Sequence, residues 1–305
     1  MVPLKVAFVG SGGAARGIAH LGVLKACEEV GIVPSVFVGT SAGALVAATY
    51  GQDIPLDVLL DAYRLPWRRR HNGPRLYMRT FLGAPKLADF LDPGYLLSGV
   101  FSMHGLERTL ERFLPENDFQ RIENQILVTA VDVDSGERVV FGKGHRTDVP
   151  ISRAVAASCC VPGLFRPMKV GDRYLMDGEV KRTLSLDLAI NAGANVIIIS
   201  NVYRPEERAA GERSLARSGP FGVVRQAVNL VMSEKERRGV ELTSRNNPRV
   251  VFLDIAPDIG AFSYANRWSA RSLVLRGYRT ALRSLTEAKE RGVFDDVASS
   301  DAALN

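Results

Sequence analysis

A serine between two glycines, placed directly after a short apolar run, most constrains the fold of this chain. The segment reads Val36-Phe37-Val38-Gly39-Thr40-Ser41-Ala42-Gly43, and small helix-forming residues follow it. This order predicts a strand, a sharp turn and a helix. Such a turn exposes the serine hydroxyl at the carboxyl end of the strand, and Gly39 and Gly43 let helix and strand approach closely. The same pattern occurs in ordinary turns, but the flanking elements favour Ser41 as a nucleophile.

A glycine-rich loop follows the first predicted strand, Lys5 to Val9. It reads Gly10-Ser11-Gly12-Gly13-Ala14-Ala15-Arg16-Gly17, and a helix is predicted from Ile18. Loops of this kind point backbone N–H groups at negative charge. The glycine spacing allows a dinucleotide site, but the second strand ends in Gly39-Thr40-Ser41 and lacks the acidic residue that would hold a ribose. The N–H groups are therefore interpreted as an oxyanion hole for Ser41.

The nucleophile also needs a base, and Asp177 is the favoured candidate. No histidine follows His145, whereas the usual order of a Ser-His-Asp hydrolase places the histidine last. His71, His104 and His145 remain formal candidates, although each lies in a polar or glycine-bearing segment. Asp177 ends a short apolar run before Gly178, so its carboxylate lies at a strand terminus. It is ionised at neutral pH and can accept the serine proton; the alternative is an ordinary tight turn at Asp177-Gly178.

Composition indicates an ordinary globular protein. The 305 residues are 46% hydrophobic and 24% charged, and the net charge of +6 is modest for this length. We find no linker and predict a single domain over residues 1–297 with a frayed tail at 298–305. No apolar run is long enough to span a membrane and no signal peptide is evident, so we expect a cytoplasmic protein. No nucleic-acid-binding motif is evident, and nucleic acid is not an expected partner.

The cysteines and histidines do not indicate a metal site. The three cysteines are Cys27, Cys159 and Cys160, which are expected to be reduced core residues. The four histidines show no paired spacing. No metal is therefore expected.

Residues 66–103 are rich in Pro, Gly, Arg and aromatic residues, and we predict a lid or insertion there. Within this segment, residues 67–82 combine a cluster of arginines with aromatic side chains. This basic-aromatic segment is either a solvated loop or a peripheral contact with a membrane surface.

The remaining pattern predicts alternating strands and helices, and therefore an α/β fold. A hairpin is expected from residues 126–132 and 137–141, and further strands at 196–200 and 250–255. Two apolar stripes at helical spacing are expected to cover the sheet. They comprise Phe221, Val224, Val228 and Val231, and Val274, Tyr278, Ala281, Leu282 and Leu285.

Together, these motifs resemble the patatin-like phospholipase family. The glycine-rich loop, the Ser41 turn, Asp177-Gly178 and the block from Ala157 to Pro167 occur in the family's order, and the likeness covers residues 4 to about 200. The resemblance implies a three-layer α/β/α sandwich with a mostly parallel central sheet. It also implies a Ser41-Asp177 dyad that hydrolyses phospholipid or lysophospholipid esters without a cofactor. The implied oxyanion hole comprises the N–H groups of Gly12, Gly13 and Ala14, and the supporting motif residues are Arg16, Gly17, Gly39, Gly43 and Gly178.

Two residues depart from the family pattern. Ala14 stands where the loop usually has a glycine, and Glu179 stands where Asp-Gly is usually followed by Gly or Ala. Glu179 adds a second carboxylate close to Asp177, which could raise the pKa of the base. Arg16 is expected to support the loop, to bind a phosphate group or to form a structural salt bridge.

Two alternatives to a lipid acyl hydrolase stay open. One is a catalytically silent lipid-binding or regulatory protein of the same fold and the other, more distant, is a dinucleotide-binding oxidoreductase.

Overall fold

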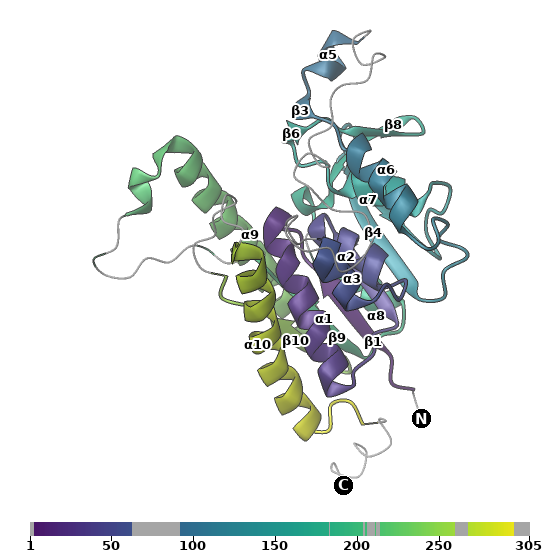
Figure 1. Ribbon diagram of the computed structural model, residues 1–305, viewed down its shortest axis with the longest axis vertical. Helices are drawn as coiled ribbons and strands as arrows, with labels where there is room; N and C mark the ends of the chain where they lie inside the picture. Colours follow the sequence, from purple (N-terminus) through teal and green to yellow (C-terminus); the bar gives the residue numbers. More distant parts are fainter. Residues whose placement is uncertain are drawn as a thin grey trace.

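The chain folds around one eight-stranded sheet (Figure 1). The computed structural model describes residues 3–62, 92–182, 184–203, 205, 211, 214–259 and 268–295. The order across the sheet is β10-β9-β1-β2-β4-β8-β7, and β5 pairs with β4 outside this path. The strands are β1 (Val6–Gly10), β2 (Val36–Thr40), β4 (Gln125–Asp132), β5 (Arg138–Phe141), β7 (Met168–Val170), β8 (Arg173–Asp177), β9 (Val196–Ser200) and β10 (Val251–Ile255).

Parallel pairing dominates the centre of the sheet. Strands β10, β9, β1, β2 and β4 pair in parallel, whereas β5, β8 and β7 add antiparallel pairs at one side. The predicted hairpin is confirmed as β4 and β5. Because β1 and β2 are adjacent and parallel, the loops that follow them meet at the same edge of the sheet.

Helices cover both faces of the sheet. Along β1, Val6 and Phe8 pack into one apolar cluster with α1, α2, α7 and α10, while Ala7 and Val9 pack on the opposite face against α8, with Val240 of α9 beside it. This alternation follows from the two-residue period of a strand. The predicted three-layer α/β/α sandwich is confirmed. The helices are α1 (Ala19–Val30), α2 (Ala42–Tyr50), α7 (Ile151–Ser158), α8 (Leu186–Asn191), α9 (Gly219–Asn246) and α10 (Trp268–Glu290).

The prediction for the last apolar stripe is correct. Helix α10 lies beside α1 (Figure 1), and Ala281 and Leu285 are fully buried. The two helices approach closely, because a Cβ atom on Gly22 would lie 2.1 Å from the Val274 carbonyl oxygen, and one on Gly277 would lie 2.2 Å from that of Ala19. The stripe therefore covers the sheet together with α1.

The prediction for the earlier stripe is wrong. Val224, Val228 and Val231 are 60%, 51% and 66% exposed on the first half of α9, so they do not cover the sheet. The second half of this helix packs on the body of the protein, where Val240 lies beside the α8 cluster and Glu236 is buried. Figure 1 shows the other end of α9 extending beyond the sheet. Helical spacing identified the helix, but it does not specify what the helix packs against.

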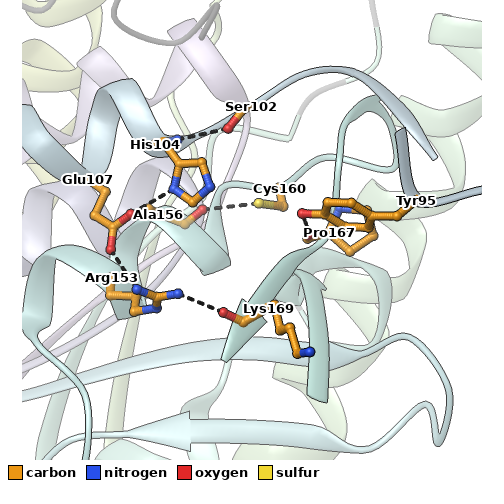
Figure 2. Close-up of polar contacts among 9 residues, drawn as sticks. All are labelled: Tyr95, Ser102, His104, Glu107, Arg153, Ala156, Cys160, Pro167 and Lys169. Atoms are coloured by element: carbon orange, nitrogen blue, oxygen red, sulfur yellow. Dashed lines mark hydrogen bonds and ion pairs between the residues drawn. The ribbon is translucent and has the colours of Figure 1, made fainter. Parts of the chain in front are cut away.

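Polar contacts join the helices near β7 (Figure 2). Helix α6 (His104–Phe113) carries Glu107, whose carboxylate contacts His104 Nδ1 at 2.9 Å and Arg153 Nη1 of α7 at 3.2 Å. Arg153 also donates to the Lys169 carbonyl on β7 at 2.9 Å. We call His104, Glu107 and Arg153 the Glu107 cluster; it fixes α6 and α7 to one side of the sheet.

Part of the predicted lid lies outside the described residues. Residues 66–91, including the basic-aromatic segment 67–82, and the tail 298–305 belong to the parts not described. Residues 92–103 contain α5 (Pro93–Leu96) and β3 (Gly99–Phe101), and β3 pairs with β6 (Gly163–Phe165). The single domain over 1–297 stays a prediction. Among the described helices, which also include α3 (Leu56–Ala62), none is both long and apolar enough to cross a membrane.

Candidate active site

Ser41 occupies a strained turn between β2 and α2. Its φ of 54° and ψ of −118° lie in a region that residues with side chains rarely adopt. The glycines on either side are needed for space: a Cβ atom on Gly39 would lie 2.3 Å from the Gly43 carbonyl carbon, and one on Gly43 would lie 2.2 Å from the Gly10 oxygen. The predicted strand, turn and helix are confirmed, and Ser41 is only 4% exposed.

A buried serine that the sequence analysis did not single out holds the turn in place. The Ser41 amide donates to Ser158 Oγ at 2.8 Å, and the Ser158 hydroxyl donates to the Thr129 carbonyl at 2.7 Å. These bonds join the turn to α7 and to β4. Ser158 lies within the block from Ala157 to Pro167, so the sequence signal was present but gave no role to this residue.

Asp177 lies at the end of β8, beside Ser41. Its amide donates to the Cys160 carbonyl at 2.9 Å. The next residue, Gly178, packs against β4: a Cβ atom added to it would lie 2.6 Å from the Thr129 carbonyl oxygen. Asp177 Oδ1 accepts from the Glu179 amide at 3.0 Å, and the Ser41 hydroxyl lies near enough to this carboxyl group to lower its pKa. The structure therefore brings Ser41 and Asp177 together. Asp177 also stabilises the tight turn after β8, because its side chain accepts from the Glu179 amide.

The carboxyl group of Asp177 is almost completely buried, with 2% exposure. Burial raises its pKa to about 7, against the lowering effect of the Glu179 amide and the Ser41 hydroxyl. A carboxylate with such a pKa is a stronger base than an ordinary aspartate and is still substantially ionised at neutral pH. The Cys159 thiol lies beside Ser41 as well, but burial raises its pKa, so it stays protonated. All three cysteines are buried and free, as predicted.

The glycine-rich loop is anchored through Ser11. The Ser11 amide donates to the Ser200 carbonyl at 3.0 Å, and Ser11 Oγ accepts from the Val202 amide at 3.0 Å. His20 is fully buried and lies 2.8 Å from the Ser11 carbonyl and 2.6 Å from Ser200 Oγ. Burial lowers the pKa of His20 to about 4, so the ring is neutral; Nε2 donates to Ser11 and Nδ1 accepts from Ser200. His20 is therefore a structural residue of the loop.

The three predicted oxyanion donors differ in their contacts. The Gly12 amide donates to Glu179 Oε1 at 2.7 Å and is already engaged. The amides of Gly13 and Ala14 donate to no residue in the described part of the chain. Gly13 has a φ of 126° and Ala14 a φ of 51°, at the start of the short helix η1 (Ala14–Ile18). Ala14 thus adopts the backbone region that a glycine would take more freely.

Glu179 lies on the short helix η3 (Gly178–Val180) and is 6% exposed. Burial and the neighbouring charge of Asp177 raise its pKa well above the usual range, although the nearby Tyr203 phenol and the Gly12 amide lower it. Oε2 has no partner in hydrogen-bonding geometry among the described residues. The prediction that Glu179 lies close to Asp177 is correct, but it is the pKa of Glu179 that this proximity raises.

The remaining predicted residues support the loop or lie elsewhere. A Cβ atom on Gly17 would lie 2.3 Å from Ala42 Cβ, so this glycine allows close packing on α2. Arg16 is buried and has a polar partner. His104 contacts Glu107, and His145 lines a separate cavity of about 530 Å³ that contains neither Ser41 nor Asp177. His71 lies outside the described residues. Among those described, no three His, Cys, Asp or Glu side chains group in a way that could hold a metal ion.

Comparison with known proteins identifies relatives of this chain. The model of the family described as patatin-like phospholipase matches residues 8–190. An uncharacterized NTE family protein of Mycobacterium tuberculosis is 26% identical over 174 residues, which are 57% of this chain and 26% of that protein. The human patatin-like phospholipase domain-containing protein 6 is 27% identical over 205 residues, which are 66% of this chain and 14% of that protein. The chain therefore corresponds to a minor part of these longer relatives.

Among solved structures, VipD from Legionella pneumophila is similar, with a TM-score of 0.45 and 13% sequence identity. The match covers 94% of this chain and 67% of that chain.

Proposed function

This chain belongs to the patatin-like phospholipase family, and on that premise we propose that it is a serine acyl hydrolase that cleaves lipid acyl esters with Ser41 and Asp177. The observation that carries the proposal is the position of the Ser41 hydroxyl beside the Asp177 carboxyl group, on a strained turn next to the glycine-rich loop. A nucleophile, a base and donors for an oxyanion are the components that acyl transfer requires.

In the first half of the proposed reaction, Ser41 Oγ attacks the carbonyl carbon of the ester and Asp177 takes the serine proton. The negative charge that develops on the carbonyl oxygen is stabilised by the amides of the glycine-rich loop, of which those of Gly13 and Ala14 have no acceptor among the described residues. One donor of this kind contributes roughly 100 to 1000-fold in rate. The bond to the leaving alcohol then breaks, and Asp177 returns the proton to that oxygen.

In the second half, water attacks the acyl group on Ser41. Asp177 takes a proton from the water, the loop again holds the oxyanion, and the bond to Ser41 Oγ breaks as the serine regains its proton. The products are a fatty acid and the free enzyme. The family supports phospholipids or lysophospholipids as the substrate, in a reaction of the phospholipase A or lysophospholipase type.

The proposal is tested by labelling the purified chain with a fluorophosphonate probe and locating the adduct by mass spectrometry. We expect modification of Ser41, its loss in Ser41→Ala, and a strong reduction in Asp177→Asn. Ser135→Ala and Asp134→Asn are matched controls, because both residues are exposed in the turn between β4 and β5. Release of fatty acid from phospholipid and lysophospholipid vesicles then identifies the substrate class. A folded wild-type chain that is not labelled and releases no fatty acid would instead indicate a silent lipid-binding protein.

A further inference from the structure

We propose that Glu179 is a positioning residue that couples the Asp177 turn to the glycine-rich loop and holds that loop in its strained conformation. The inference rests on the proposed function, because it assigns Glu179 to the site in which Ser41 reacts.

Glu179 makes three contacts with three different parts of the site. Its amide donates to Asp177 Oδ1 at 3.0 Å, and its Oε1 accepts from the Gly12 amide at 2.7 Å. Its carbonyl accepts from Lys235 Nζ of α9 at 3.0 Å. The residue therefore ties the proposed base and the proposed oxyanion loop to each other and to the covering helix.

The side chain of Glu179 fills the space beside Gly12. A Cβ atom on Gly12 would lie 2.5 Å from Glu179 Cδ and 2.6 Å from Oε1, so the carboxyl group packs directly against the loop backbone. This contact lies between the Ser11 anchor on one side and Ala14 on the other. Ser11 is held by Ser200, Val202 and His20, whereas Gly12 is held by Glu179.

Ala14 explains why such a contact is needed. Its φ of 51° is costly for a residue with a Cβ atom, and strained backbone persists only where the surrounding structure fixes it. By holding the Gly12 amide, Glu179 fixes the loop on the side from which the chain enters Gly13 and Ala14. The amides of these two residues, which have no acceptor in the described part of the chain, are then kept in place for the substrate oxygen.

The contact between Glu179 and the Gly12 amide is compatible with a protonated, neutral Glu179 carboxyl group. The groups that face Glu179 are the Asp177 carboxyl group, the Tyr203 phenol, Glu236 of α9 and Lys235 at the backbone carbonyl. Burial and the charge of Asp177 favour the protonated form of Glu179. A neutral carboxyl group still accepts from Gly12, and it places no negative charge beside the oxyanion that forms during the reaction.

The test compares rates of fluorophosphonate labelling at Ser41 in the full chain. We expect Glu179→Ala to lower the rate roughly 10 to 100-fold, because it releases the Gly12 amide. Glu179→Gln keeps a neutral acceptor, so it should retain the rate within about threefold and leave the pH midpoint of labelling unchanged. In an Ala14→Gly background, the loss caused by Glu179→Ala should shrink to about threefold or less, because the loop no longer carries the strain. Glu234→Gln, an exposed change on α9, is the matched control.

Each contrary result has a defined meaning. An equal or faster rate in Glu179→Ala overturns the positioning role, since Glu179 would then be inert or would obstruct the site. A lower pH midpoint in Glu179→Gln shows that Glu179 is ionised in the wild type and overturns the neutral form. Equal losses in the wild-type and Ala14→Gly backgrounds overturn the link with strain. Circular dichroism and urea unfolding check that each variant is folded, and absence of labelling in the wild type counts against the proposed function itself.

Discussion

Two sites in this protein contain buried carboxyl groups, and they differ in the partners that surround these groups. In the Glu107 cluster, the carboxylate is 10% exposed and contacts both Arg153 and His104. Asp177 and Glu179 are buried more deeply, and they accept from the amides of Glu179 and Gly12, respectively. Among the described residues, no basic side chain pairs with either carboxyl group. The first arrangement compensates the charge of a carboxylate. In the second, no cation among the described residues compensates the charge of Asp177, and that charge raises the pKa of Glu179.

The difference shows how the environment separates a structural carboxylate from a candidate base. A cation beside a buried carboxylate stabilises the ionised form, so such a group holds elements together and is a poor proton acceptor. Burial without a cation raises the pKa, which makes the group a better base but costs stability when it ionises. Figure 2 shows the compensated cluster, which joins α6, α7 and β7.

The largest expected effect is on activity, and it comes from Asp177, whose carboxyl group has no basic partner among the described residues. Asp177→Asn should lower Ser41 labelling and ester hydrolysis about 10² to 10⁴-fold, because it removes the proton acceptor and leaves the shape of the side chain unchanged. Glu107→Gln should change the rate less than about threefold, although it removes a carboxylate that is also buried. Steady-state hydrolysis of a lysophospholipid measures both. A similar loss in both variants would show that the two groups of carboxylates do not differ in role.

The next effect is the pH dependence of stability. Since burial raises the pKa of Asp177 from 3.8 to about 7, the folded chain holds a proton that the unfolded chain has released between these pH values. This contribution to stability is complete below about pH 4 and is lost as the pH rises through about 7. Asp177→Asn should remove this contribution. The free energy of unfolding of the variant minus that of the wild type should therefore rise by about 1.4 kcal/mol per pH unit between pH 3.8 and about 7.

Urea unfolding of both proteins across this pH range measures the difference. His20 acts in the opposite direction, because its lowered pKa of about 4 destabilises the fold as the pH falls, but it is common to both proteins and cancels. Asp134→Asn, on an exposed turn, is the control and should leave the wild-type slope unchanged. Parallel curves for Asp177→Asn and the wild type would show that Asp177 titrates normally in the folded protein.

The sequence was sufficient to predict the centre of the fold and the residues that meet there. The strand before Ser41, the loop after Val9 and the short run that ends at Asp177 each have a local signal in apolar runs and glycines. Parallel strands then bring two of these ends to one edge of the sheet. The structure places Ser41 beside Asp177, as the motifs indicated.

Contacts that depend on tertiary packing could not be predicted in this way. Helical spacing identified α9, but the exposure of Val224 and Val228 depends on where the helix leaves the body of the protein. The bond between Glu179 and Gly12 joins residues 167 positions apart, and nothing in the sequence gives this distance. Ser158 and His20 were missed for the same reason, because their roles come from the backbone groups that surround them.

A smaller effect is expected on stability alone, from Arg153. Arg153→Met keeps much of the apolar stem but leaves Glu107 with His104 as its remaining partner in Figure 2. Because Arg153 is 36% exposed and partly screened by solvent, the loss should be about 1 to 3 kcal/mol, below that of a fully buried pair. Urea unfolding measures it, and Ser41 labelling should stay at the wild-type level. Arg237→Met, in an exposed group of ion pairs on α9, should have a smaller effect than Arg153→Met and is the control.

The smallest expected effect comes from the other partner of Glu107. His104 lies three residues before Glu107 on the same helix, its side chain is 17% exposed, and its Nδ1 is 2.9 Å from Oε2. His104→Asn should lower the free energy of unfolding by about 0.5 to 1 kcal/mol, because Arg153 still compensates the carboxylate. In the Arg153→Met background the same change should cost more, since Glu107 then loses both partners of the Glu107 cluster. Urea unfolding of the two single variants and the double variant measures this coupling. Strict additivity would mean that His104 and Arg153 do not share the charge of Glu107, and the contrast with Asp177 and Glu179 would then rest on Arg153 alone.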